Sequence, residues 1–186
     1  MADYWFTADH HFNHEHILRY TNRPFKSIGE HDYRLIQLWN DRVKIDDVVF
    51  YLGDFCFRET KERNAQYYLN QLNGQKIFIS GNHDNNNGLR TCIQDIRIYL
   101  GGKNILLVHN PNESTFGFDL CLVGHLHNRW KFKTMTFEKY RWDVVNIGVD
   151  QWNYRPVTIN EILEEYYKWK KGIINDRGER KNGSLK

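Results

Sequence analysis

Side chains that can bind a metal ion follow short apolar runs at five places in this chain. These side chains are Asp9, His11, Asp54, Asn82, His109, His125 and His127. They offer oxygen and imidazole nitrogen, which suit manganese, iron or zinc, and no thiolate stands among them. Seven ligands are too many for one tetrahedral ion and about right for two ions that share a bridging carboxylate. The sequence therefore predicts a centre of two divalent ions.

Such a centre is suited to the hydrolysis of phosphoesters. Two divalent ions about 3.5–4 Å apart can clamp the attacking and the leaving oxygen of an in-line displacement. A water shared between them loses a proton near neutral pH and becomes a hydroxide nucleophile. The leaving alkoxide needs a proton, which a histidine that titrates near neutrality can donate.

The apolar runs that precede the ligands predict buried strands, several of them ended by a glycine. The strands are expected over 4–8, 47–52, 76–80, 96–100, 104–108 and 120–123, with one or two more within 130–145. Ligands of an open α/β sheet bind beyond the carboxyl ends of its strands, where the loops converge on one crevice. The predicted ligands and the predicted strands therefore indicate the same edge of the fold.

Helical patterns lie between and after these strands. Helices are expected over 30–43, over 60–72 and from Thr158 to about 169, where Thr158 and Glu161 form a capping box. The first half thus alternates strand and helix, whereas the second half is rich in strands. This order favours two sheets that pack face to face.

Length and composition indicate one domain. The chain has 186 residues, of which 40% are hydrophobic, so we expect a single domain over 1–170 and a basic, flexible tail over 171–186. No run approaches the roughly 20 apolar residues of a membrane span, and the start does not resemble a secretion signal. Three cysteines without a C-x-x-C pair favour a cytoplasmic location. A net charge of +3 is too weak to imply nucleic-acid binding by itself.

The order of these motifs resembles the calcineurin-like metallophosphoesterase superfamily. The motifs are Asp9-x-His11, Gly53-Asp54, Gly81-Asn82-His83-Asp84, His109 and Gly124-His125-x-His127, and the segments 7–14 and 22–25 resemble its small bacterial and phage branch. The resemblance implies an α/β fold of the metallo-dependent phosphatase type. Two mixed sheets flanked by helices would form a four-layer α/β/β/α sandwich, with the dinuclear centre at its edge.

The resemblance also implies a role for each residue of the motifs. The ligands would divide into Asp9, His11 and His127 for one ion, Asn82, His109 and His125 for the other, and Asp54 as the bridge. His83 would act as the general acid, and Asp84 would orient it. Manganese suits this ligand set best, and iron, zinc or nickel would also fit it.

Three further side chains are candidates for contacts with the substrate phosphate. His14 follows the first motif closely, and Arg23 and Arg58 carry guanidinium groups that match phosphate oxygens. Asp84 is followed by three asparagines instead of an arginine, which weakens the grip expected on the dianion of a phosphomonoester.

The sequence therefore predicts a metal-dependent phosphoester hydrolase with a phosphodiester as its favoured substrate. A nucleotide or a nucleic acid would be such a substrate, although only analogy with the family suggests it. One alternative is a phosphomonoesterase that acts on a small molecule or a protein. The other is a scaffold of the same fold without turnover, which the retained metal-type histidines disfavour. Neither the physiological substrate nor the oligomeric state follows from the sequence.

Overall fold

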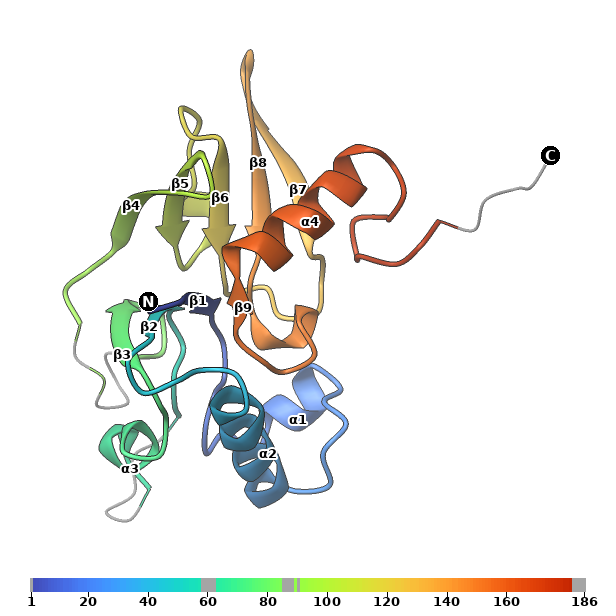
Figure 1. The fold of residues 1–186 in the computed structure, drawn as a ribbon. Helices are drawn as coiled ribbons and strands as arrows, with labels where there is room; N and C mark the ends of the chain where they lie inside the picture. Colours follow the sequence, from blue (N-terminus) through green and yellow to red (C-terminus); the bar gives the residue numbers. More distant parts are fainter. Residues whose placement is uncertain (1, 58–62, 85–88, 90, 182–186) are drawn as a thin grey trace.

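Two β-sheets face each other across the largest cluster of buried apolar side chains (Figure 1). The structure is a computed structural model that describes residues 2–57, 63–84, 89 and 91–181. The first sheet has the strand order β3-β2-β1-β9. Its strands are β1 (Tyr4–Thr7), β2 (Val48–Leu52), β3 (Gln75–Ile79) and β9 (Val157–Thr158). The first three are parallel, and β9 pairs antiparallel with β1.

The second sheet has the strand order β4-β5-β6-β8-β7. Its strands are β4 (Asp95–Leu100), β5 (Lys103–Val108), β6 (Leu120–Val123), β7 (Phe132–Phe137) and β8 (Tyr140–Asn146). The central three, β5, β6 and β8, are parallel, and antiparallel hairpins add β4 and β7 at the two edges. Both sheets are therefore mixed, and their parallel strands end at one side of the molecule.

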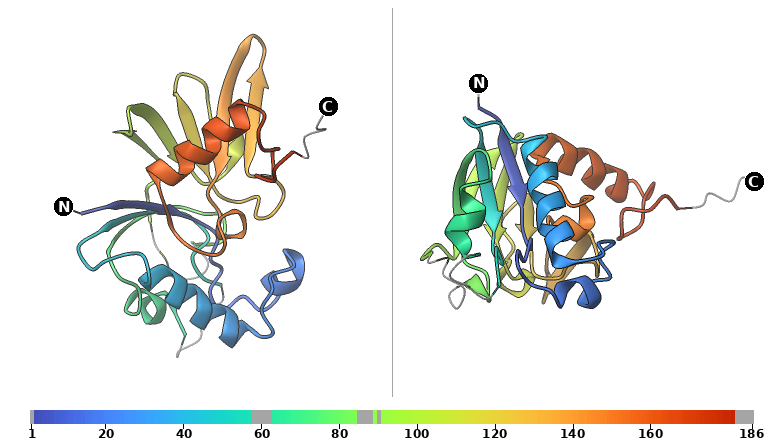
Figure 2. Two further views of the ribbon diagram at one scale, coloured as in Figure 1. Left: turned by 45° about the vertical axis from the view of Figure 1, so that its right-hand side comes forward. Right: turned by 90° about the horizontal axis from the view of Figure 1, so that it is seen from below.

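Helices α2 (Ile28–Asn40) and α3 (Ala65–Leu69) cover the outer face of the first sheet (Figure 2). Their apolar side chains, among them Trp39 and Tyr68, form a second buried cluster with residues of β1 and β2. Helix α1 (Ile17–Tyr20) lies in the loop between β1 and α2. Helix α4 (Ile159–Lys170) follows β9 directly and begins with the expected capping box.

The predicted α/β class with two mixed sheets is confirmed, and the predicted strands agree with the observed ones to within about two residues. The flanking helices are also present. Of these, α4 contributes Ile159, Ile162 and Tyr166 to the core between the sheets. The observed α3 is shorter than the helix expected over 60–72, part of which lies outside the described residues. The short elements α1 and β9 were not expected.

Residues 171–181 do not form the flexible tail that the composition predicts. Ile174 is buried in the core between the sheets and pairs with Arg180 in an isolated antiparallel bridge. The backbone amides of Lys131 and Phe132 both donate to the carbonyl oxygen of Asp176, at 2.8 and 3.0 Å. A single buried isoleucine and backbone hydrogen bonds, which composition does not reveal, anchor this segment to β7. Residues 182–186 lie outside the described part of the chain.

No helix within the described residues combines the length and the apolar character that a bilayer crossing requires.

Candidate metal centre

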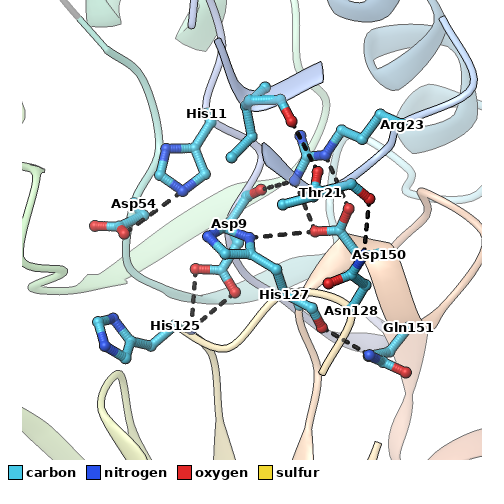
Figure 3. A network of polar contacts seen from close by, with 12 residues as sticks. Asp9, His11, Thr21, Arg23, Asp54, His125, His127, Asn128, Asp150 and Gln151 are labelled. Carbon is cyan, nitrogen blue, oxygen red and sulfur yellow. Dashed lines mark hydrogen bonds and ion pairs between the residues drawn. The ribbon is translucent and has the colours of Figure 1, made fainter. Parts of the chain in front are cut away.

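The predicted metal ligands lie together at the carboxyl ends of the parallel strands. Figure 3 shows Asp9, His11, Asp54, His125 and His127 of this set. Asp9 and His11 follow β1, Asp54 follows β2, and Asn82 follows β3. His109 follows β5, and the pair His125 and His127 follows β6, so both sheets contribute to the site. The rule that strand ends converge on one crevice therefore holds across the two sheets.

Two groups of side chains could each hold a metal ion. They are Asp9, His11 and His127, and Asp54, His109 and His125. Within each group, the candidate ligand atoms all lie within 4.8 Å of one another. The side-chain oxygen of Asn82 adds to the second group, because it lies 3.0 Å from His109 Nε2 and 2.8 Å from His125 Nδ1.

Asp54 lies between the two groups. Its Oδ2 atom is 3.6 Å from His11 Nε2 and 3.5 Å from His109 Nε2. Its other oxygen, Oδ1, accepts a hydrogen bond of 3.0 Å from the backbone amide of His83. One carboxylate oxygen thus faces a histidine of each group, which is the position that a bridging ligand requires.

The ring of His11 fits a metal ligand for a second reason. His11 is 1% exposed, and neither of its ring nitrogens has a hydrogen-bond partner within the described part of the chain. Burial also lowers the pKa of His11 well below its ordinary value, so the ring is neutral and keeps a free lone pair. Buried polar atoms without partners are uncommon and costly in folded proteins. A cation beside Asp54 and Asp9 would give His11 Nε2, the nitrogen that faces Asp54, a binding partner.

Carboxylates and imidazoles lie close enough at this site to shift one another's pKa values. Burial raises the pKa of Asp9 to about 6, although nearby histidines oppose the change. Burial disfavours a charged His109, but its contact with Asp54 and the charge of Asp9 raise the pKa of His109 to about 9. Both shifts follow from burial and from the close contact of carboxylates with imidazoles.

The backbone at the candidate ligands adopts the left-handed conformation. The φ angles are 61° at Asp9, 52° at His11, 59° at Asp54, 73° at His125 and 47° at His127. Residues with a Cβ atom rarely adopt this region, and such strain is concentrated at functional sites, at a cost of about 1–3 kcal/mol each. The chain therefore holds five costly turns in order to aim these side chains at one point.

Two glycines leave room for the carboxylates. A Cβ atom on Gly81 would lie 2.3 Å from Asp54 Oδ1, and one on Gly148 would lie 2.5 Å from Asp9 Oδ2. Neither glycine needs a positive φ. Their role is thus close approach rather than the sharp turn that a glycine after a strand suggests. Gly148 was not among the residues that the sequence singled out.

The structure contradicts the role predicted for Asp84. Its Oδ2 accepts hydrogen bonds from the backbone amides of Asp54 and Gly81, at 2.9 and 2.8 Å, and its Oδ1 accepts one from Phe55 at 2.9 Å. The carboxylate therefore ties the loop after β2 to the loop after β3. Asp84 positions the candidate bridge Asp54 and does not orient the ring of His83.

Arg23 is a structural residue and not a phosphate ligand. It is 4% exposed, and its guanidinium pairs with both oxygens of Asp150, at 2.9 and 2.8 Å (Figure 3). It also donates to the backbone carbonyls of Asp9 and His10, at 2.7 and 2.8 Å. A buried guanidinium with these partners cannot reach a substrate.

Asp150 connects Arg23 to the first group of candidate ligands. Its Oδ2 lies 3.3 Å from His127 Nδ1, so it can fix the orientation of that ring. The side chains of Asn146 and Gln151 both donate to the His127 carbonyl oxygen, at 3.0 and 2.7 Å. These three residues were not predicted. Their position could have indicated them, because they lie at or just after the end of β8, and β8 is the parallel neighbour of β6.

Of the remaining predicted site residues, the structure describes His83 and His14 but not Arg58. His83 and His14 line a cavity of about 600 Å³ beside His11 and His127. His14 is 7% exposed and stacks on Phe57. Arg58, the other phosphate contact expected from the sequence, lies outside the described residues.

Replacement of Asp150 by asparagine should weaken metal binding by the first group. The amide keeps the shape of the side chain but loses the charge that faces His127 and Arg23. Loss of such a supporting carboxylate typically costs about 10- to 100-fold in metal affinity. Competition with a chelator measures the affinity, and Asp95→Asn on the exposed strand β4 is the matched control. Unchanged affinity in a folded Asp150→Asn protein would contradict this role.

Comparisons with known proteins place the chain among relatives of unassigned activity. No model of a known protein family matches it. It is 27% identical over 198 aligned residues to the gene 66 protein of Mycobacterium phage D29, covering 88% of this chain and 96% of that protein. Its fold matches the crystal structure of the protein of unknown function AQ665 from Aquifex aeolicus, with a TM-score of 0.66 and 24% identity. That match covers 88% of this chain and 99% of the other.

The uncharacterized protein MJ1445 of Methanocaldococcus jannaschii is 33% identical to this chain over 171 residues. The alignment covers 91% of this chain and 94% of MJ1445. At this identity, extended over nearly all of both sequences, the chain belongs to the family of MJ1445.

Proposed function

We propose that the chain is a metal-dependent phosphoester hydrolase of the calcineurin-like metallophosphoesterase superfamily. One ion would be held by Asp9, His11 and His127, the other by Asn82, His109 and His125, with Asp54 as the bridge. The observation that carries the proposal is the position of Asp54 Oδ2, at 3.6 and 3.5 Å from a histidine nitrogen of each group. A carboxylate so placed between two sets of nitrogen and oxygen donors suits two ions better than one.

Two bound divalent ions would supply Lewis acidity and a nucleophile at neutral pH, the requirements for attack on a phosphoester. The protein's own groups prepare the ligands. His109 Nδ1 lies 2.7 Å from the carbonyl oxygen of Leu52, which only accepts, so Nδ1 donates the hydrogen. The other nitrogen, Nε2, is thereby directed at Asn82 and Asp54. Manganese, iron, zinc and nickel all remain candidates, because this donor set accepts each of them.

His83 is the proposed general acid. Its backbone amide donates to Asp54 Oδ1, which fixes the residue beside the bridge, and its side chain lines the cavity. The ring centroid lies 5.6 Å from that of His11 and 5.8 Å from that of Phe57. The ring therefore stands next to the candidate metal ligands at a place where a leaving oxygen can receive a proton.

A phosphodiester is the substrate class that the cavity favours. Its volume of about 600 Å³ is lined by His11, His83 and His127 and by Ile17 and Tyr20 of α1, which leaves room for a large ester substituent beside the candidate metal centre. Arg23, the predicted phosphate ligand, is committed to Asp150, so Arg129 is the one arginine among the described residues that line the cavity. A scaffold without turnover would not need the strained backbone at the candidate ligands.

Rates on two chromogenic esters separate the diesterase from the monoesterase. The protein with added Mn²⁺ should hydrolyse bis-(para-nitrophenyl) phosphate with a higher kcat/KM than para-nitrophenyl phosphate. The reverse preference would support the monoesterase. Absence of turnover on both, with metal bound, would support the scaffold.

The His83→Ala variant should lose turnover and keep its metal. Removal of a general acid costs roughly 10²- to 10⁴-fold when the leaving group is an alkoxide. With para-nitrophenolate, which leaves without a proton, the loss should be much smaller. Steady-state rates on an alkyl and a nitrophenyl diester, together with elemental analysis, measure both effects. Equal losses on the two esters would count against the role of His83 as an acid.

A further inference from the structure

Four aromatic rings that contact one another line the cavity beside the candidate metal centre. His14 stacks on Phe57 with ring centroids 3.9 Å apart and planes 19° from parallel. The edge of Tyr20 faces His14 at 6.2 Å and 76°. His16 lies beside Tyr20 at 6.0 Å and 28°. All four of these residues line the cavity.

Tyr20 is an exposed ring of this aromatic group. It is 73% exposed, whereas His14, on which its edge rests, is 7% exposed. The Tyr20 ring is connected to the candidate metal ligand His11 through His14. The ring centroids of His11 and His14 are 5.4 Å apart, and those of His14 and Tyr20 are 6.2 Å apart. A phosphate at the metal centre could thus carry a group that lies against Tyr20.

Residues that follow β6 also line the cavity. They are Leu126, Asn128 and Arg129, and the Asn128 side chain donates to the carbonyl oxygen of Thr21, next to Tyr20, at 2.8 Å. Arg129 carries the one permanent charge among the described residues that line the cavity, and no carboxylate lines it there. A cavity lined by flat rings and a cation suits an anion that carries a planar group.

We infer that this cavity binds the nucleoside arm of a phosphodiester, with the base stacked on Tyr20. This inference rests on the proposed function and narrows its substrate class to nucleotide diesters. Stacking accepts any base, because every base has a π-face, so no sequence preference is expected from Tyr20. Arg129 would contact an anionic group on the same nucleotide or on the next one.

Two methyl esters that differ only in the base test this inference. They are the methyl ester of adenosine 5′-monophosphate and the methyl ester of ribose 5-phosphate, followed by ³¹P nuclear magnetic resonance with Mn²⁺ present. The wild-type protein should show the higher kcat/KM with the adenosine ester. In Tyr20→Leu this preference should fall roughly 5- to 100-fold, and in Tyr20→Phe it should persist. Tyr99, which is also 73% exposed but lies on β4, supplies the control Tyr99→Leu.

The outcomes distinguish the inference from the proposed function. If both esters react at equal rates, or if Tyr20→Leu keeps the wild-type preference, the inference is wrong and the hydrolase stands. If neither methyl ester nor the chromogenic esters react, the proposed function fails, and ligand binding still tests the cavity. Calorimetry should then show adenosine 5′-monophosphate binding more tightly than ribose 5-phosphate, with the difference lost in Tyr20→Leu. Equal binding of the two would overturn the inference.

Discussion

The burial of two carboxylates beside several imidazoles is the constraint on which this structure depends. Asp9 and Asp54 are 0% and 1% exposed, and both face the histidines that follow the strands of the second sheet. Buried ionised groups are costly unless opposite charges compensate them. Burial raises the pKa of Asp9 to about 6, and the contact with Asp54 and the charge of Asp9 raise the pKa of His109 to about 9. A pair of divalent cations would remove this cost and explain why the residues converge.

The rest of the fold holds these charges in place. Asp84 ties the loops after β2 and β3 together through three backbone amides. Arg23 ties the loop after β1 to Asp150, and Asp150 faces His127. Each buried charge in this framework has a partner of opposite sign or a set of amide donors, so the framework can resist the backbone strain at the ligands. Rigidity around the site is what a preorganised metal centre requires.

The sequence predicted the strands and the convergence of the ligands well, because both follow from local patterns. Apolar runs identify buried strands, and polar residues directly after them lie at one edge of a sheet. The sequence did not predict that side chains of α4 and Ile174 pack into the core between the sheets, because such packing depends on contacts between distant segments. For the same reason, Arg23 was assigned to the substrate and Asp84 to His83. A charged residue in a motif does not reveal whether its partner is a ligand, a carboxylate or a backbone amide, and Asp150 carries no local motif at all.

The most direct test of the dinuclear centre is anomalous diffraction from crystals grown with Mn²⁺ in excess. Two anomalous peaks on opposite sides of Asp54 are expected, one near Asp9, His11 and His127 and the other near Asn82, His109 and His125. Elemental analysis of the same protein should give two equivalents of manganese. No peak at Asp54, or a single manganese bound elsewhere on the protein, would contradict the account.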